Sequence, residues 1–169
     1  MEYSGVLLVN KEKGMGSTKV VSKVRKALNT RDVGHCGTLD PLAEGLLIVT
    51  IGKALKISRF LEADEKEYIA TIKLGERTLT LDREGEIVEK KEITPFNKQD
   101  IENVFKSLIG KIKQKPPIYS AVSVNGKRLY EYARENIQVE IKERDIEIKE
   151  LELLEYGNDS IKYRVVCSK

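Results

Sequence analysis

The sequence predicts an α+β protein with a mixed, mainly antiparallel sheet flanked by helices. Three observations support this fold class. Short runs rich in Val, Ile and Leu recur along the chain and are bounded by turn-forming residues, as strands are. Residues 17–28 and 97–110 instead carry apolar side chains at the spacing of amphipathic helices. These helices interrupt the strands irregularly, which favours α+β over a regularly alternating α/β fold.

The N-terminal third is expected to hold two strands and two helices. Residues 5–10 (GVLLVN) predict a short buried strand that ends at the turn signal of residues 13–14. Ser17 can cap a helix that runs to about Leu28. A second strand and a short helix are expected at 45–52 and 55–61.

The rest of the chain is predicted to consist of strands around one longer helix. Residues 66–75 form a strand, and Asn97 caps a helix whose apolar residues continue to Gly110. The pair Pro116–Pro117 then interrupts regular structure. Turns are expected at 82–85, at the hairpin-forming Asn125–Gly126 pair and at 157–159.

Composition narrows the class of protein. The 169 residues are 40% hydrophobic and 34% charged, which is typical of a globular chain. No apolar run approaches the roughly 18 residues of a membrane helix, and the N-terminus lacks a secretory signal, so we expect a cytoplasmic protein without a membrane partner. With two cysteines and one histidine, we expect neither a disulfide framework nor a metal site.

Charge is distributed unevenly along the chain. Residues 1–60 carry 10 Lys and Arg against 5 Asp and Glu, whereas the remaining residues carry 20 against 22. A basic N-terminal third is typical of a protein with a polyanionic partner, although a solvated lysine-rich face would look the same.

The stretch VGHCGTLDPLAEGLL, residues 33–47, crowds polar side chains between glycines and looks too irregular for a helix or a strand. One interpretation is structural: Asp40 and Pro41 begin about one helical turn, and the glycines make bends. Another is a reactive site, because a carboxylate on a Gly-flanked, Pro-stiffened loop can be exposed and held in one orientation. His35 would add a donor, an acceptor and a flat stacking surface. The residues alone leave both interpretations open.

This stretch closely resembles the signature of the TruB-type tRNA pseudouridine synthases, G-H-x-G-x-L-D-P-x-A-x-G-x-L. The resemblance continues along nearly the whole chain and in the same order. Further matching segments are EKEYIATIKLGERT, LDREGEIVE, QKPPIYSAVSVNGKRLYEYAREN and VVCSK. Several long matches in order make a chance resemblance improbable.

The resemblance implies an enzyme that isomerises a uridine in the T-loop of tRNA, at position 55, to pseudouridine without a cofactor or a metal. Asp40 matches the essential aspartate, which assists cleavage of the N-glycosidic bond by covalent attack or by abstraction of a sugar proton. His35 matches the histidine near the flipped nucleotide. Tyr68 matches the tyrosine that stacks on the target ring, whereas a lone tyrosine on a strand is otherwise more often a core residue.

Residues 117–143 resemble the family's thumb-like segment that reaches around the RNA. This segment carries basic residues beside the aromatic Tyr119, Tyr130 and Tyr132, a mixture suited to phosphates and bases, and we expect it to be mobile without RNA. A solvated hairpin and helix is the other interpretation. The residues expected to contact RNA are Lys127, Arg128 and Arg134 in this segment, and Lys19, Lys23 and Arg25 in the N-terminal helix.

The sequence also departs from the family pattern. Lys11 matches, but Glu12 stands where the family usually has proline, and Leu79 stands where an acidic residue is common. The chain ends at Lys169, before the family's Gly-Thr-Tyr-Ile-Arg motif, whose arginine pairs with the catalytic aspartate.

We therefore expect residues 1–169 to form an incomplete catalytic domain without the PUA-type RNA-binding domain, weakly active or inactive as it stands. We expect the complete protein to be a monomer. For residues 1–169 alone, we expect association through the strand edge that the truncation exposes. The alternatives are a related synthase acting on another RNA and a non-catalytic module that binds the T-arm of tRNA.

Overall fold

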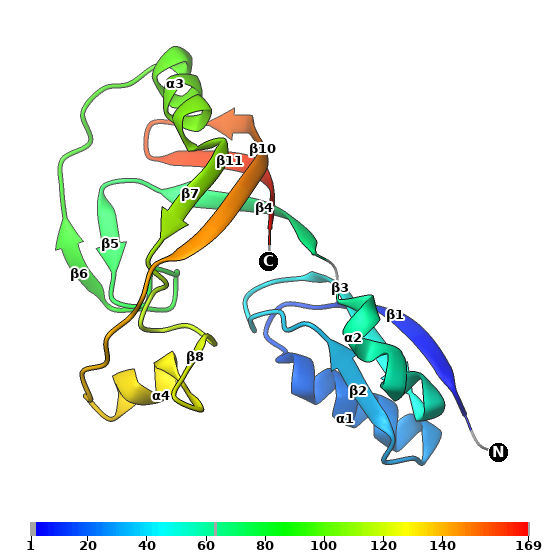
Figure 1. The fold of residues 1–169 in the computed structure, drawn as a ribbon. Coiled ribbons are helices and arrows are strands. Elements are labelled where there is room, and N and C mark those ends of the chain that lie inside the picture. Colours follow the sequence, from blue (N-terminus) through cyan, green and yellow to red (C-terminus); the bar gives the residue numbers. More distant parts are fainter. Residues whose placement is uncertain (1–2, 63, 169) are drawn as a thin grey trace. The chain divides into compact units, whose positions relative to one another are not determined.

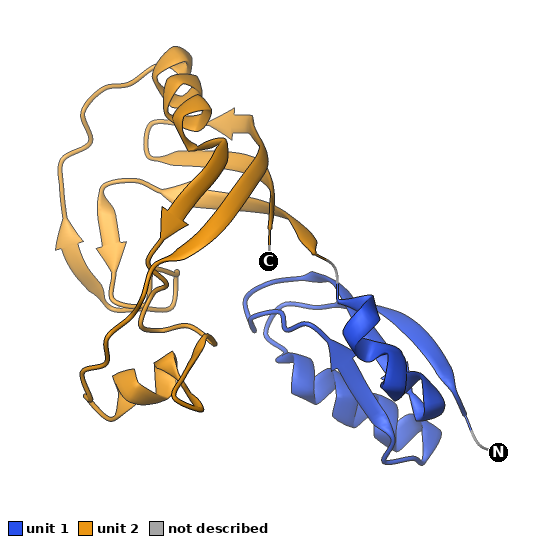
Figure 2. Cartoon of the chain, viewed as in Figure 1, with its two compact units in different colours: residues 1–63 blue, residues 64–169 orange. Residues whose placement is uncertain are grey.

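A computed structural model describes residues 3–62 and 64–168. The chain divides into two compact units, Met1–Ala63 and Asp64–Lys169, which Figure 2 shows in separate colours. Both units combine helices with sheets, and every strand pairing in the described residues is antiparallel. The expected α+β class with mainly antiparallel sheets is confirmed.

The first unit is a three-stranded sheet with a helix packed on it (Figure 1). Its strands lie in the order β1-β3-β2, and the helices come between and after them. The elements are β1 (Gly5–Lys11), α1 (Ser17–Leu28), β2 (Val33–Cys36), β3 (Gly45–Ile51), the 3₁₀ helix η1 (Gly52–Ile57) and α2 (Ser58–Leu61). The N-terminal helix therefore ends at Leu28 as the sequence predicted, but it includes Ser17.

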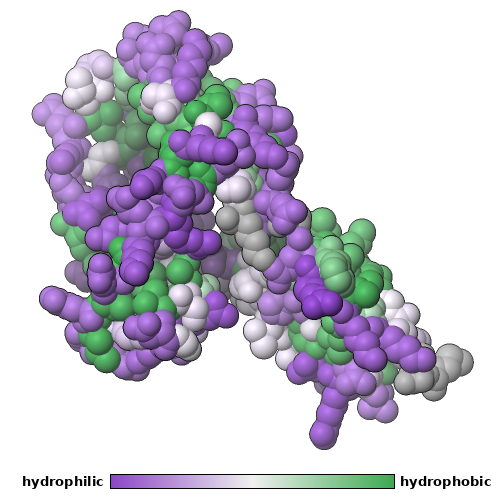
Figure 3. Space-filling model, viewed as in Figure 1, coloured by the Kyte–Doolittle hydropathy of each residue, from purple (hydrophilic) through white to green (hydrophobic). Residues whose placement is uncertain are grey.

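The core of this unit lies between α1 and one face of the sheet. Val20 and Val21 of α1 pack with alternate residues of β3, and Leu47 and Val49 are almost completely buried there. Side chains of the other face are less covered, and Leu8 of β1 is 66% exposed. The prediction that β1 is buried was therefore wrong, because α1 covers only one face of that strand. Figure 3 shows hydrophobic surface on this unit near α2.

The second unit is built on a four-stranded antiparallel sheet in the order β4-β11-β10-β7. These strands are β4 (Glu65–Lys73), β7 (Gly110–Gln114), β10 (Arg144–Tyr156) and β11 (Ser160–Ser168). Helix α3 (Lys98–Leu108) packs on the sheet through Phe105, whose ring lies edge-on to Tyr163 with centroids 6.0 Å apart. Asn97 caps α3 as predicted, in a capping box with Asp100.

Two small hairpins complete the second unit. One pairs β5 (Glu76–Thr78) with β6 (Ile87–Lys90), and the other pairs β8 (Ser123–Val124) with β9 (Lys127–Arg128), directly before α4 (Leu129–Arg134). The second hairpin turns at Asn125 and Gly126, whose φ angles of 50° and 80° are those of the tight turn that this residue pair predicted.

Two local expectations for the first unit were wrong. Ser17 does not cap α1: the residue before the helix is Gly16, and no side chain caps that end. Residues 33–36 are not irregular but form β2, which pairs with β3 from Val33 to Cys36. In both cases the deciding partner comes from a distant part of the chain, which local propensity does not reveal.

Candidate active site

Asp40 lies on an exposed turn that follows β2. The backbone N–H of Ala43 donates to the carbonyl of Asp40 at 3.1 Å, which closes a four-residue turn with Pro41 in its second position. Proline is favoured at that position because its ring fixes the required φ. The turn leaves the Asp40 side chain exposed to solvent.

The turn is tied to the segment that precedes α1. The backbone N–H of Gly14 donates to the carbonyl of Pro41 at 2.8 Å. The hydroxyl of Ser17 bonds both backbone groups of Leu39, accepting from its N–H at 3.0 Å and donating to its carbonyl at 3.1 Å. These bonds fix the backbone on both sides of Asp40, so the backbone that carries the carboxylate has a defined position.

Lys11 adds a third connection to this turn. Only 1% of Lys11 is exposed, and its ammonium donates to the carbonyls of Glu12 at 3.1 Å, Met15 at 2.8 Å and Ala43 at 2.5 Å. All three N–H groups of an ammonium are thus satisfied, as a buried charge requires. Sequence reasoning noted Lys11 only as a match, because a lysine at the end of a strand carries no local sign of burial.

We call residues 39–43 the Asp40 loop. Its four long-range hydrogen bonds reach three residues of the segment 11–17, namely Lys11, Gly14 and Ser17. A catalytic carboxylate needs this kind of fixed support, since a small displacement of a reacting group costs a large part of the rate.

His35 lies on β2, half-buried, opposite Val49 of β3. Its Nδ1 bonds the carbonyl of Gly37, and a carbonyl can only accept, so Nδ1 carries the proton. In the neutral ring Nε2 is then an acceptor. Gly37 has a φ of +88°, which residues with a side chain rarely adopt, so this glycine allows the bend that brings its carbonyl to the histidine.

The predicted RNA contacts in the first unit lie on α1. Lys19, Lys23 and Arg25 are all exposed, and Arg25 also donates to the carbonyl of Val33 at 2.8 Å. That bond joins α1 to the first residue of β2. Arg25 therefore has a structural contact besides any contact with a phosphate.

Tyr68 belongs to the second unit, whereas Asp40 and His35 belong to the first. It lies on β4 opposite Val165 of β11, and 40% of it is exposed. Because directly opposed residues share a face, Tyr68 and Val165 project from the same side of the sheet. A ring at this position is supported by the sheet and still accessible.

The second unit also contains the segment 117–143. Lys127 pairs with Glu135 and lies 5.0 Å from the ring centre of Tyr132. Arg128 donates to the carbonyl of Ala121. Arg134 lies over the ring of Tyr130 at 5.2 Å, and the fully buried Leu129 lies at the start of α4.

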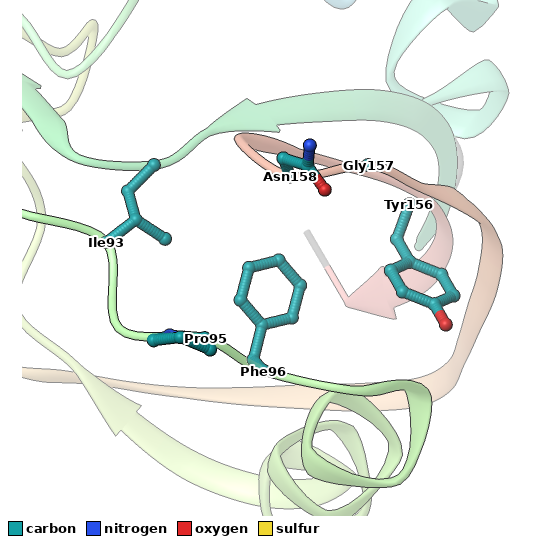
Figure 4. Close-up of a pocket in the computed structure, with 6 residues that line it drawn as sticks. All are labelled: Ile93, Pro95, Phe96, Tyr156, Gly157 and Asn158. Atoms are coloured by element: carbon teal, nitrogen blue, oxygen red, sulfur yellow. The ribbon is translucent and has the colours of Figure 1, made fainter.

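A cavity of about 510 Å³ lies elsewhere in the second unit, as Figure 4 shows. It is lined by Ile93, Pro95, Phe96, Tyr156, Gly157 and Asn158. None of these residues carries a carboxylate, an imidazole or an amine. Phe96 directly precedes the cap of α3 and contacts the ring of Tyr156 with centroids 6.3 Å apart, which gives it a packing role.

Within residues 3–62 and 64–168, no three His, Cys, Asp or Glu side chains gather as metal ligands would. In the same residues no helix has the length and apolar character needed to span a membrane. Both cysteines, Cys36 and Cys167, are free thiols. Burial raises the pKa of the Cys167 thiol, which disfavours its nucleophilic thiolate form.

Comparison with known proteins gives one consistent result. Residues 25–169 match the family model described as TruB family pseudouridylate synthase (N terminal domain). The chain is 46% identical over 170 residues to tRNA pseudouridine synthase B of Francisella philomiragia, and 46% identical over 175 residues to the protein of that name from Shouchella clausii. These alignments cover 100% of this chain but 56% and 58% of the relatives, so the chain spans little more than half their length.

Solved structures show the same fold. A crystal structure of a Cbf5-Nop10-Gar1 complex contains a chain that matches with a TM-score of 0.68 and 28% identity, covering 97% of this chain and 39% of that one. A structure of an H/ACA RNP bound to a substrate RNA containing 2′-deoxyuridine matches with a TM-score of 0.67 and 24% identity, covering 97% of this chain and 38% of that one.

Proposed function

The chain belongs to the TruB family of pseudouridylate synthases, and we propose that the protein isomerises a T-loop uridine of tRNA, at position 55, to pseudouridine. The observation that carries this proposal is the Asp40 loop: an exposed carboxylate on a turn whose backbone is tied to Lys11, Gly14 and Ser17. The relatives named tRNA pseudouridine synthase B supply the substrate class.

We propose Asp40 as the catalytic carboxylate. It assists cleavage of the N-glycosidic bond, either by attacking the sugar or by abstracting a sugar proton. The freed uracil then turns and rejoins the sugar through carbon, and a site that retains the base makes this second step effectively unimolecular. The target nucleotide has to leave the base stack for this chemistry.

His35 and Tyr68 are the proposed contacts to the flipped nucleotide. The Nδ1–H bond to Gly37 holds the His35 ring in one orientation, which presents Nε2 to a ligand as an acceptor. Tyr68 offers an accessible ring on a rigid strand, and base stacking on an aromatic ring is worth about 1–3 kcal/mol.

The proposed RNA surface consists of the exposed cations of α1 and the exposed or half-buried cations of the segment 117–143. Neutralising phosphates with lysine and arginine releases counterions, so binding through these residues should weaken steeply with salt. The residues are Lys19, Lys23, Arg25, Lys127, Arg128 and Arg134. We further propose that the T-arm is the part of tRNA bound, that residues 1–169 belong to one catalytic domain, and that the protein works in the cytoplasm as a monomer.

The experiment is a tritium-release assay with the full-length protein and a tRNA transcript labelled at C5 of uridine, without any guide RNA. Wild type should release tritium from position 55, whereas Asp40→Asn should release none while its affinity for the tRNA stays within a few-fold. Asp32→Asn is the matched control, because Asp32 is an exposed aspartate just before β2. Tritium release by Asp40→Asn would refute the assignment of Asp40.

Failure of wild type on tRNA alone would refute the proposed substrate and favour a relative that acts on another RNA. If wild type binds the transcript and releases no tritium under any condition, the chain is a binding module instead.

A further inference from the structure

Ser17 is the first residue of α1, yet its hydroxyl does not cap the helix. The hydroxyl instead bonds Leu39 twice, accepting from the N–H at 3.0 Å and donating to the carbonyl at 3.1 Å. Ser17 is 3% exposed, so both bonds are shielded from water. A hydroxyl has one donor and two acceptor sites. The Ser17 hydroxyl uses its donor and one of its acceptor sites on the backbone of Leu39.

Leu39 is thereby held on two sides. Its side chain packs against the core cluster formed by α1 and the sheet, and its backbone is bonded to Ser17. Asp40 follows directly, and the turn that it opens is bonded to Gly14 through Pro41 and to Lys11 through Ala43. The Ser17 bonds are the ones in this set that lie on the N-terminal side of the carboxylate.

We propose that Ser17 is a positioning residue for Asp40, acting through the backbone of Leu39; this inference rests on the proposed function of the Asp40 loop. Loss of the hydroxyl leaves two partly buried backbone groups of Leu39 without their partner. The backbone relaxes toward water to satisfy them, and the carboxylate next to it loses its defined position.

A general effect on the helix would act differently. Gly16 precedes α1 without any side-chain cap, so the Ser17 side chain contributes no cap that could be lost. Alanine also has a higher helix propensity than serine, so Ser17→Ala does not weaken α1 itself. The loss of fixed structure in Ser17→Ala should therefore be confined to Leu39 and the loop that follows.

The test compares Ser17→Ala with Ser22→Ala in the full-length protein. Ser22 is the matched control because its hydroxyl is on the same helix but donates to the carbonyl of Thr18 at 3.0 Å, within that helix. For Ser17→Ala we expect the single-turnover rate at saturating tRNA to fall about 10- to 100-fold, with tRNA affinity unchanged within twofold. The Leu39 amide should exchange with solvent at least about tenfold faster than in wild type. Ser22→Ala should change neither.

A Ser17→Ala rate within twofold of wild type would overturn the proposal, as would an equal loss in Ser22→Ala or unchanged exchange at Leu39. Should Ser17→Ala fail to fold, the wild-type protein still decides: a Leu39 amide that exchanges as fast as an unstructured one excludes the bond to Ser17. The exchange measurement does not depend on turnover, so it separates failure of this inference from failure of the proposed function.

Discussion

The Asp40 loop and the segment 117–143 are held in different ways. The loop is fixed by hydrogen bonds from buried groups, with Lys11 and Ser17 at 1% and 3% exposure. The segment is held at its surface by an exposed ion pair and by cations lying over tyrosine rings. The buried bond from the charged Lys11 contributes about 1.5–3 kcal/mol and each neutral bond about 0.5–1.5 kcal/mol, whereas exposed ion pairs contribute about 0–1 kcal/mol.

This difference suits the roles proposed for the two regions. A reacting carboxylate has to be in place before the substrate arrives, because ordering it during the reaction would cost rate. A segment that contacts RNA gains from weak internal contacts, since Lys127 or Arg134 can exchange a tyrosine ring or a carboxylate for a phosphate at little cost. Substitutions that remove supports of the Asp40 loop should therefore lower stability, whereas substitutions of cations in the segment 117–143 should weaken RNA binding.

The largest effect on stability is expected from Lys11→Met. Methionine keeps the length of the side chain but leaves the carbonyls of Met15 and Ala43 without a donor. We expect the free energy of unfolding to fall by about 2–4 kcal/mol, measured by urea titration. Lys13→Met is the control, because Lys13 is exposed and its pair with Glu44 spans 3.6 Å. Equal losses in the two variants would show that burial of Lys11 is not what holds the loop.

An intermediate effect is expected in the segment 117–143. Replacing Lys127 and Arg128 by alanine removes one half-buried and one exposed cation and should weaken tRNA binding without abolishing turnover at saturating tRNA. The slope of log affinity against log salt should fall by roughly one to two units, at about 0.9 for each phosphate that is no longer neutralised. Titrations at several salt concentrations measure this slope. An unchanged slope would indicate a solvated hairpin and helix, and the same change at Lys98 and Lys106 of α3 serves as control.

The smallest effect is expected at Asp82, in the turn between β5 and β6. Its carboxylate accepts from the Thr80 hydroxyl at 2.7 Å and from the backbone N–H groups of Glu84 and Gly85, and these bonds lower its pKa. A lowered folded-state pKa stabilises the fold above the unfolded value of 3.8, and this gain is lost as pH falls through the folded value.

Asp82→Asn should therefore lower the free energy of unfolding by less than about 1 kcal/mol at pH 7, because the carboxylate is exposed and screened by solvent. At low pH, where Asp82 is protonated, the substitution should not change this free energy. Urea titrations of both proteins between pH 7 and the acid limit measure the difference. A difference that stays constant down to low pH would contradict this explanation.

Local signals in the sequence predicted much of the fold. The helix at 17–28, the cap at Asn97 and the hairpin at Asn125–Gly126 depend on neighbouring residues, and all three are present. What the sequence did not reveal depends on distant partners. Ser17 looks like a cap, but its hydroxyl bonds Leu39, 22 residues away.

The candidate site shows the same division. Asp40 and His35 stood out because polar groups gather there between glycines, and the family resemblance then gave them roles. Lys11 gave no comparable signal, because its three acceptors are backbone carbonyls, one of them 32 residues away. Carbonyls are present at every position of the chain, so no residue type marks such a partner. Supporting residues of this kind become visible only in the folded chain.

The most direct test of the contrast between the two regions is amide hydrogen exchange, measured with and without a T-arm RNA. We predict that in the free protein the amide of Leu39 is at least about tenfold more protected than those of Arg128 and Ile137, two exposed residues of the segment 117–143. RNA should then increase protection at Arg128 and Ile137 and leave Leu39 nearly unchanged. Equal protection in the free protein, or a gain on RNA binding confined to the Asp40 loop, would contradict this contrast.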